Sequence, residues 1–536
     1  MTLRSVLNNI WRAKATDRAI GITLAFCLFA LIACKFVLAE YAPSLLIPSY
    51  IFVFGLISVI SFQKPFWGIA VIAAGLPVEL LLPPISFATS LYPIIGAATL
   101  CGYLFHELLV EKVQPVFTWT HVVGALFVLW FSLSNPNAAF VVGNRVWFFT
   151  FLQLLVFLWL TTQLVDTREK ERKLLLAFVF ASVVSALFAI SQVTYGIDSA
   201  TSIRATGLAG GPNGAARIYV LAIMFLAYFV FTVKRRSSQY LSLIGIAILF
   251  AALAATVSRT GLLLLLTAGG SVLVFPGRQL KRKKIAVLLS LLLGALLVVP
   301  SDYWRIAAGI LSSIVTGTDS VGFRYMQWEA GFQMWRDHFL SGVGVGQFQT
   351  TIPFYGTQFT PFYGLGYVSH NFILALLAET GIIGAMLFVG ICCATILALI
   401  RAVGKTSIEN KLPLYVWLTA LIIVLLGGST GDTHFDKMLW FLLGIKGLKV
   451  EGFLHQRLNL AEGNLLLRPK QKNPCASQPP QHTGTGTADQ SGLFHVPLTS
   501  STSDRKSFGS RFNGSISISG MEIFSRYCGT ICFRRI

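Results

Sequence analysis

Two arginines, Arg204 and Arg217, flank a glycine-rich stretch at 205–214 that leads into a long apolar run. A glycine-rich turn at the start of a helix can present backbone N–H groups to an anion. Guanidinium groups beside such a turn can each hold a phosphate through two parallel hydrogen bonds. The pattern therefore predicts an anion site that takes phosphate, with Asn213 of the same turn as a further contact. The alternative is a plain external turn with two solvated arginines.

A third arginine, Arg259, lies in the sequence Ser258-Arg259-Thr260-Gly261, between two apolar runs with almost no loop. An arginine exposed to hydrocarbon costs at least about 2.5–3.5 kcal/mol, so a cation at membrane depth is a candidate for function. Arg259 is therefore a functional candidate, because the rule that keeps basic residues in cytoplasmic loops disfavours an arginine at this external position. The alternative is an arginine whose head group reaches the membrane interface and serves as an anchor.

One histidine, His370, begins a long apolar run in the sequence Ser369-His370-Asn371-Phe372. Imidazole titrates close to neutral pH and can accept a proton from a hydroxyl nucleophile. His370 is therefore a candidate general base, and a helix-capping or interfacial histidine is the alternative. Glu379 lies further along the same run. It is a candidate for substrate binding, although a buried hydrogen bond that supports packing is the favoured reading of this side chain.

The composition indicates which class of protein carries these residues. Hydrophobic residues make up 55% of the 536-residue chain and charged residues only 12%, whereas soluble domains carry about 25% charged residues. The formal net charge of +20 would suggest a polyanionic partner, but the basic residues cluster in short segments between apolar runs, as in membrane proteins. The eight cysteines show no spacing typical of metal or disulfide sites. The chain is therefore an integral membrane protein, not a soluble enzyme, a disordered protein or a nucleic-acid binder.

The apolar runs predict an all-α polytopic membrane protein with about 12–14 transmembrane helices, since a helix needs about 20 apolar residues to cross the hydrocarbon. The first run is too long for a removable signal peptide and is expected to be an anchor. The predicted spans lie near 19–39, 45–62, 65–82, 88–106, 119–134, 146–165, 174–194, 216–233, 240–257, 260–276, 285–300, 371–400, 413–428 and 437–450.

Charges in the connections predict the orientation. The even-numbered connections are basic, at 64, 112, 168–173, 234–236, 278–284 and 401–405, whereas odd-numbered ones such as 134–144 are nearly uncharged. Because basic loops stay in the cytoplasm, both termini are expected to be cytoplasmic. The chain then divides into an N-terminal multispan region at 1–200, a second membrane region at 201–450 and a disordered cytoplasmic tail at 451–536.

The connection at 301–369 is expected to be one large external loop with structure of its own. It holds 15 aromatic residues and only seven charged ones, and loops longer than about 15 residues are uncommon unless they are functional. Arg324, Trp328 and Trp335 recur at helical spacing across 323–339, followed by the glycine-punctuated stretch 342–346. This pattern predicts an interfacial helix and a turn that pack over the outer mouth of the membrane region.

Taken in order, these motifs resemble the O-antigen ligase and polymerase family of bacterial envelope glycosyltransferases. The resemblance covers about 200–445 and rests on the turn with Asn213, the Ser258-Arg259 motif, Arg324 with Trp328, the glycines at 342–346, and Ser369-His370-Asn371 ahead of Glu379. No single motif is specific to the family, but the ordered set with a large external loop is.

The resemblance implies a function at the periplasmic face of the bacterial inner membrane. The donor would be a glycan on undecaprenyl pyrophosphate, and the acceptor would be lipid A core in a ligase or a second lipid-linked glycan in a polymerase. Arg259 and Arg217 would hold the pyrophosphate, His370 would activate or position the acceptor hydroxyl, and Arg204, Arg324, Asn213 and Glu379 would contact substrate. No cofactor or metal is expected, because the family resembled is metal-independent and no acidic cluster is evident on the external loops.

Two other functions fit parts of the sequence. Many-span chains with charges at membrane depth often transport solutes, which makes a transporter of a small solute or anion the main alternative. Against it, the charged candidates lie at the predicted outer rim, and the two halves show no repeat. A different lipid-sugar transferase would need an acidic base, for which Glu40 alone is available in the first external loop.

Overall fold

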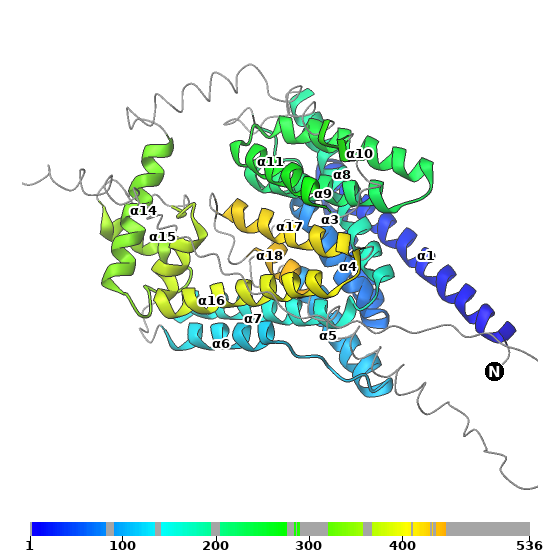
Figure 1. Ribbon diagram of the computed structural model, residues 1–536, viewed down its shortest axis with the longest axis horizontal. Helices are drawn as coiled ribbons and strands as arrows, with labels where there is room; N and C mark the ends of the chain where they lie inside the picture. The colour runs from blue at the N-terminus through cyan, green and yellow to red at the C-terminus, as the bar shows by residue number, and fades with distance from the viewer. Residues whose placement is uncertain are drawn as a thin grey trace, which may run out of the picture. The chain divides into compact units, whose positions relative to one another are not determined.

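The computed structural model describes residues 3–81, 91–134, 141–194, 204–275, 284–285, 287–289, 320–356, 367–408, 411–428, 431 and 436–445, all within a compact unit formed by 1–467 (Figure 1). The predicted span at 285–300 lies largely outside these residues, and the predicted tail at 451–536 lies entirely outside them. Among the described residues every regular element is helical.

The helices follow the order of the predicted spans. Their bounds are α1 Leu3–Ala33, continued by η1 Cys34–Leu38 and α2 Ala39–Tyr41; α3 Pro43–Gln63; α4 Pro65–Gly75 with η2 Leu76–Leu81; α5 Leu91–Gly102 with η4 Tyr103–Val110; α6 Trp119–Leu133; α7 Val141–Leu164; α8 Arg168–Thr194; α9 Pro212–Thr232; α10 Arg236–Ala255; α11 Arg259–Val274; α14 Ser320–Asp337; α15 Phe348–Thr351 with η7 Ile352–Tyr355; α16 Phe372–Lys405; α17 Lys411–Gly427; and α18 Lys437–Gly444.

Eight of these helices are long and apolar enough to cross a membrane, and four shorter apolar helices accompany them in the described part of the chain. The all-α polytopic membrane fold expected from the sequence is thereby confirmed. α18 is shorter than a span, and the rest of the predicted span at 437–450 lies outside the described residues. The helix predicted at 323–339 is present as α14, and its position at the membrane interface stays a prediction.

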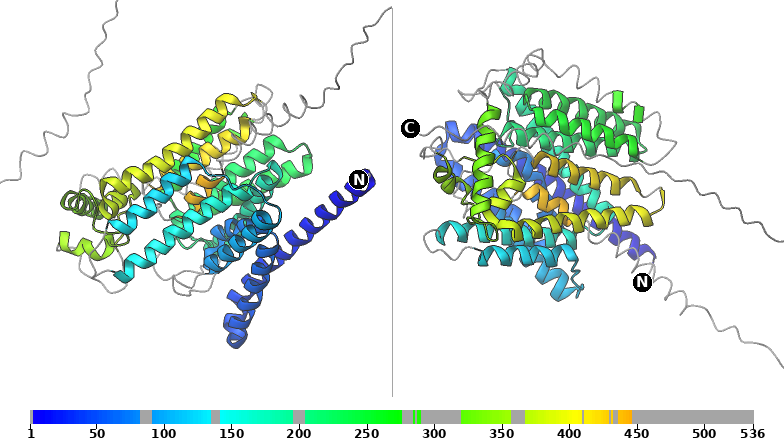
Figure 2. Two further views of the ribbon diagram at one scale, coloured as in Figure 1. Left: turned by 90° about the horizontal axis from the view of Figure 1, so that it is seen from below. Right: turned by 60° about the vertical axis from the view of Figure 1, so that its left-hand side comes forward.

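α9 is the most deeply buried of the long helices, because its sequence is apolar on every side. It packs against α8, α10, α11 and α17, and nearly all its side chains from Ala215 to Phe231 are buried. Figure 2 shows α9, α10 and α11 in green side by side, and α16 in yellow alongside α6 in cyan. The N-terminal helices therefore pack directly against the helices of the second half of the chain.

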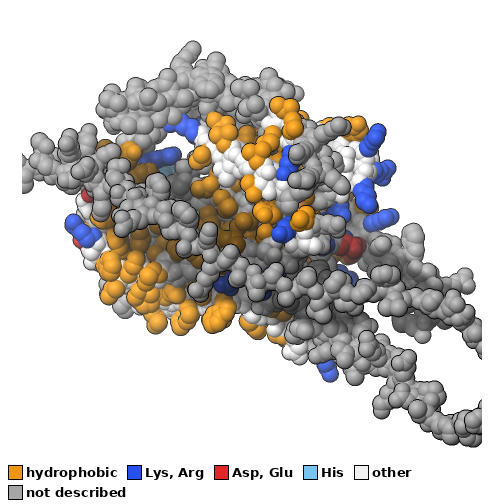
Figure 3. Space-filling view, viewed as in Figure 1, with side chains coloured by type: hydrophobic (Ala, Val, Ile, Leu, Met, Phe, Trp, Pro, Cys, Tyr) orange, Lys and Arg blue, Asp and Glu red, His pale blue; other side chains and the backbone are white. Residues whose placement is uncertain are grey.

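The surface agrees with immersion in lipid. Large apolar side chains are exposed along α6 and α16, among them Leu126, Leu133, Met386 and Leu397. Figure 3 shows hydrophobic side chains over these helices, and basic side chains gathered at the turn between α9 and α10. Soluble monomers rarely expose contiguous apolar patches of this kind, so the exposed face of α6 and α16 is the one expected to contact the hydrocarbon of the membrane.

The glycine-punctuated stretch 342–346 docks onto a kink in α16. Gly381 has φ +65° inside α16, and a Cβ there would lie 2.2 Å from the Leu340 carbonyl oxygen. The N–H groups of Val343 and Gly344 donate to the carbonyls of Ala378 and Glu379 at 2.8 and 3.0 Å. Backbone can approach backbone this closely only where side chains are absent. These bonds fix the short helices α14 and α15 against the first half of α16.

Candidate active site

The turn between α10 and α11 is joined to the start of α9 by a hydrogen-bond network centred on Asn213. Arg204 donates from Nη2 to Asn213 Oδ1 at 3.0 Å and from Nε to the Thr256 carbonyl at 3.0 Å. Ser258 Oγ donates to the same Asn213 oxygen at 2.9 Å and accepts from the Gly261 N–H at 3.1 Å, which caps α11. The network holds Arg204 against the residues that begin α11.

Arg259 occupies the first position of α11 and is exposed. The residue two positions before it, Val257, has φ +47°, a conformation that is unusual for a β-branched side chain. Backbone strain of this kind costs about 1–3 kcal/mol and concentrates at functional sites. Gly261 allows α11 to approach α9, because a Cβ there would lie 2.8 Å from Ala216 Cβ. The strained turn and the close approach fix the direction in which α11 starts.

Arg324 of α14 lies near Arg259 of α11. Burial and the nearby charge of Arg259 both hold the pKa of the Arg324 guanidinium below its usual value. Within the described part of the chain neither guanidinium has a carboxylate partner. Two like charges held together without a counter-ion repel each other, and a bound anion between them would relieve that repulsion.

Arg217 lies one helical turn beyond Asn213 on α9 and forms an ion pair with Asp436. Its Nη2 is 3.1 Å from Asp436 Oδ2, and the two side chains are 17% and 22% exposed. Asp436 also caps α18, because its Oδ1 accepts from the Met438 N–H at 2.8 Å. Gly427 at the end of α17 leaves room for the arginine, since a Cβ there would lie 2.9 Å from Arg217 Cδ. Three helices therefore determine the position of Arg217.

His370 precedes α16 with φ +52°, again a left-handed conformation that is rare outside glycine. Its neighbours hold this geometry. Trp328 of α14 donates from Nε1 to the Ser369 carbonyl at 2.9 Å, and Ser369 Oγ donates to the Asn371 carbonyl at 2.8 Å. The Asn371 side chain caps α16 by accepting from the N–H groups of its first turn. Trp328 lies one turn after Arg324, so α14 carries both the arginine and the tryptophan that fixes the chain before His370.

Glu379 has a different environment. It is buried, and its Oε1 accepts from the Phe348 N–H at 3.2 Å, at the start of α15. This hydrogen bond corresponds to the packing role that the sequence favoured. Its position on α16, beside the docked stretch 342–346, makes Glu379 a support of α15. Contact between Glu379 and substrate stays a prediction.

The structure thus joins Arg204, Asn213 and the start of α11 in one network and brings Arg324 next to Arg259. Sequence reasoning missed Asp436 and Gly427, the residues that position Arg217. An acidic residue just before an apolar run is a helix-capping signal that could have drawn attention to Asp436. Among the described residues, no three His, Cys, Asp or Glu side chains form a group that could hold a metal ion.

The helices and their apolar surface define an all-α polytopic membrane protein, with arginines near the starts of several helices. Residues 244–389, from α10 into α16, match the protein-family model described as O-antigen ligase. The match confirms the resemblance to the O-antigen ligase and polymerase family and, with it, a membrane glycosyltransferase-like function. It includes Arg259, Arg324, His370 and Glu379. No curated protein sequence matches the chain.

Proposed function

We propose that the protein transfers or polymerises glycan from undecaprenyl pyrophosphate onto an acceptor hydroxyl at the periplasmic face of the bacterial inner membrane. The bond between the anomeric carbon and the pyrophosphate oxygen breaks, and a bond from that carbon to the acceptor oxygen forms. The acceptor proton moves to a base, and undecaprenyl pyrophosphate leaves. The acceptor is lipid A core in the ligase form of the reaction and a second lipid-linked glycan in the polymerase form.

The observation that carries this proposal is that Arg259 and Arg324, from separate helices, are near enough for their charges to interact, and neither has a carboxylate partner within the described residues. A pyrophosphate leaving group gains negative charge in the transition state, so fixed guanidinium groups stabilise that state more than the ground state. Arg204, which Asn213 holds, supplies further positive charge from the turn before α9. Arg217 contributes charge when the substrate phosphate replaces Asp436 as its partner. With this counter-charge from arginines, the reaction needs no metal ion.

His370 is the proposed base or positioning group for the acceptor hydroxyl. The hydrogen bond from Trp328 to Ser369 holds the chain before His370 on α14, the helix that also carries Arg324. A correctly held general base contributes about 10²–10⁴ in rate. The left-handed backbone of His370 supports this role, because strain is retained where the surrounding structure requires one orientation of a side chain.

The proposed orientation has both termini in the cytoplasm. The basic residues at the turn between α9 and α10, Lys234, Arg235 and Arg236, are exposed. Each of the other basic connections in the sequence falls an even number of spans away from this turn. The arginine group comprises Arg204, Arg217, Arg259 and Arg324. Its first three members lie near the start of α9 and just after the end of α10, the ends opposite this basic turn, and Arg324 lies in the predicted external connection 301–369. These positions are periplasmic under the rule for basic loops.

The test is transfer from purified lipid-linked glycan in proteoliposomes. Arg259→Lys should lower turnover at least tenfold, because lysine keeps the charge but cannot form the planar two-point contact. His370→Ala should lose about 10²–10⁴ of the rate, the contribution of a general base. Arg336→Lys is the matched control, since Arg336 is an exposed arginine of α14 whose partner is its neighbour Asp337.

His370→Gln distinguishes base from positioning group, because glutamine keeps a hydrogen bond but has no basicity near neutral pH. An active His370→Gln variant would show that His370 positions the acceptor hydroxyl and does not act as its base. Wild-type transfer by both Arg259→Ala and His370→Ala, at matched membrane levels, would refute the catalytic site. Deletion of this protein in the native host, followed by gel analysis of surface glycans, identifies the acceptor. Loss of all long glycan from lipid A indicates a ligase, whereas lipid A that carries only a single repeat unit indicates a polymerase.

A further inference from the structure

A cavity of about 370 Å³ lies among the N-terminal helices, and none of the four arginines of the arginine group lines it. Its walls come from α1, α3, α4, η2, α5 and α8, and they are almost entirely hydrocarbon, with Lys173 as the charged member of the lining. Its volume falls in the range of about 300–1,000 Å³ that is typical of ligand sites. A lining with so few polar atoms holds hydrocarbon rather than water or sugar.

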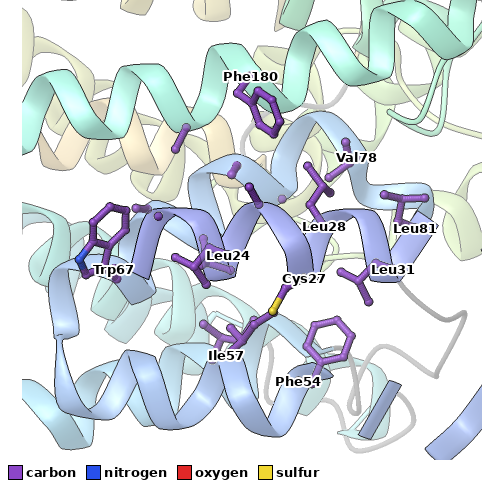
Figure 4. A pocket seen from close by; sticks show the side chains of 18 of the residues that line it. Leu24, Cys27, Leu28, Leu31, Phe54, Ile57, Trp67, Val78, Leu81 and Phe180 are labelled. Carbon is purple, nitrogen blue, oxygen red and sulfur yellow. The ribbon is translucent and has the colours of Figure 1, made fainter. Parts of the chain in front are cut away.

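The cavity is elongated along the helices. Figure 4 shows Trp67 at one end and Leu81 at the other, with side chains of α1 between them. The lining residues of α1 run from Gly21 to Leu31, which is about 15 Å at 1.5 Å per residue. This is about half the thickness of the hydrocarbon layer of a bilayer. A slot of this shape fits a lipid chain that runs along the membrane normal.

The side of the cavity formed by α8 opens to the surface. Leu176 and Phe180 both line the cavity, and they are 52% and 44% exposed. Ala70 and Ala74 of α4, which packs beside α8, also line the cavity. The opening beside α8 would admit a lipid chain from the surrounding bilayer.

One end of the cavity is closed by charge. Lys173 forms ion pairs with Asp17 of α1 and with Glu169 on its own helix, the second at 3.0 Å. Both carboxylates are used by this lysine, so the charged member of the lining is neutralised within the protein. Under the proposed function a donor lipid in the cavity carries its anionic head at the other end, which adjoins the glycine-rich stretch after Arg204.

The other end of the cavity is bonded to the segments that carry the arginine group. The Leu80 N–H of η2 donates to the Leu208 carbonyl at 2.9 Å, in the glycine-rich stretch that follows Arg204. Tyr92 lines the cavity, and Lys437 Nζ lies 4.6 Å from the centroid of its ring. Lys437 directly follows Asp436, the partner of Arg217.

Because one end of the cavity adjoins the segments that carry the arginine group, we propose that the cavity binds the polyisoprenoid chain of the lipid-linked donor. The part of the lipid chain that it holds is the part nearest the pyrophosphate. The proposal rests on the proposed function for the identity of the donor. The chain enters beside α8 and lies along α1 and α4, and its head group points past Tyr92 toward the arginine group. Lys437 is paired with Glu79 of η2 at 2.7 Å, so the arginines are the cations assigned to the head group. Because the chain comes from the bilayer and not from water, the cavity selects the lipid carrier by the packing of its hydrocarbon, and the arginines select it by its charge.

The test uses a polyprenyl pyrophosphate without sugar that carries a diazirine in the isoprene unit nearest the pyrophosphate. The full-length protein in nanodiscs should be labelled on α1, α4 or α8. Unlabelled undecaprenyl pyrophosphate should compete, whereas a tenfold excess of phosphatidylglycerol should not. Ala74→Phe, which fills the slot, should lower labelling at least tenfold and raise the KM for the lipid-linked donor. Ala177→Leu on α8 provides a second filling variant if Ala74→Phe fails to insert.

Ala247→Phe is the matched control, because Ala247 is exposed on α10 and far along the chain from the cavity lining. It should label like the wild type. Equal competition by phosphatidylglycerol would overturn the proposal in favour of a structural phospholipid, and unchanged labelling of both filling variants would overturn it outright. The labelling needs no turnover. Inactive transfer with specific labelling would therefore refute only the proposed function, and normal transfer with unspecific labelling would refute only the lipid site.

Discussion

Replacing Asn213 by aspartate changes the charge beside Arg204 but keeps the hydrogen-bond geometry that positions it. The Asn213 Oδ1 accepts from Arg204 at 3.0 Å and from Ser258 at 2.9 Å. An aspartate keeps an oxygen in the same position, so both hydrogen bonds can form. It also brings a negative charge into contact with Arg204, which then has less positive charge to offer to a pyrophosphate.

The expected magnitudes differ between stability and activity. A typical hydrogen bond contributes about 0.5–1.5 kcal/mol net, so Asn213→Ala should cost about 1–3 kcal/mol of stability through its two lost bonds. Asn213→Asp should be close to neutral in stability, since it retains both. A hydrogen bond to a charged group is worth about 1.5–3 kcal/mol. If Asn213→Asp removes the contribution of the bond between Arg204 and the substrate phosphate from the transition state, kcat/KM should fall about ten- to hundredfold, at about 1.36 kcal/mol for each tenfold change.

The assay is initial transfer rates at varied lipid-linked donor, together with the midpoint of thermal unfolding in detergent. The expected pattern is a stable but slow Asn213→Asp and a less stable Asn213→Ala. Asn213→Asp with wild-type kcat/KM would show that no substrate anion lies near Arg204. A strongly destabilised Asn213→Asp would instead refute the hydrogen-bond geometry assigned to this turn.

Three further predictions follow from the packing and the loop charges. Gly342→Ala should destabilise the protein by about 2–5 kcal/mol in thermal unfolding, because its φ is +71° and a Cβ would lie 2.3 Å from the Glu379 backbone. Gly404→Ala, with no neighbouring atom within 4 Å, should be neutral or stabilising. A cysteine at exposed Gln349 should react with an impermeant maleimide from the periplasm and one at Arg235 only after permeabilisation; the reverse would invert the topology. EDTA should leave transfer by the purified enzyme intact, and a loss restored by magnesium or manganese would contradict metal independence.

Much of the fold could be predicted from the sequence because helix-forming apolar runs are local. α16 begins at Phe372 and α14 spans Ser320–Asp337, close to the starts expected from the apolar run at 371–400 and from the aromatic spacing at 323–339. The kink in α16 could not be predicted. Its cause is the approach of the stretch 342–346, which is a contact between segments well separated along the chain.

The candidate site was predictable only as a set of residues. The arginines and the histidine could be recognised as candidates because ionisable side chains are costly at membrane depth and are therefore rare among apolar runs. For Glu379 the sequence left substrate contact and packing open, and the hydrogen bond to the Phe348 N–H shows what its carboxylate does in the fold. Nothing in the sequence linked Arg217 to Asp436, because hydrophobic periodicity does not say which helices become neighbours.

The sequence by itself determined that this protein is an all-α membrane protein with arginines and a histidine at the starts of particular helices, because length, hydropathy and charge are properties of each segment alone. Only the tertiary structure decided that Arg324 lies near Arg259, that Asn213 joins Arg204 to Ser258, and that an apolar cavity adjoins these segments. Such relations depend on the packing of one helix against another, and packing is fixed by the complementary shapes of surfaces that are distant in the chain.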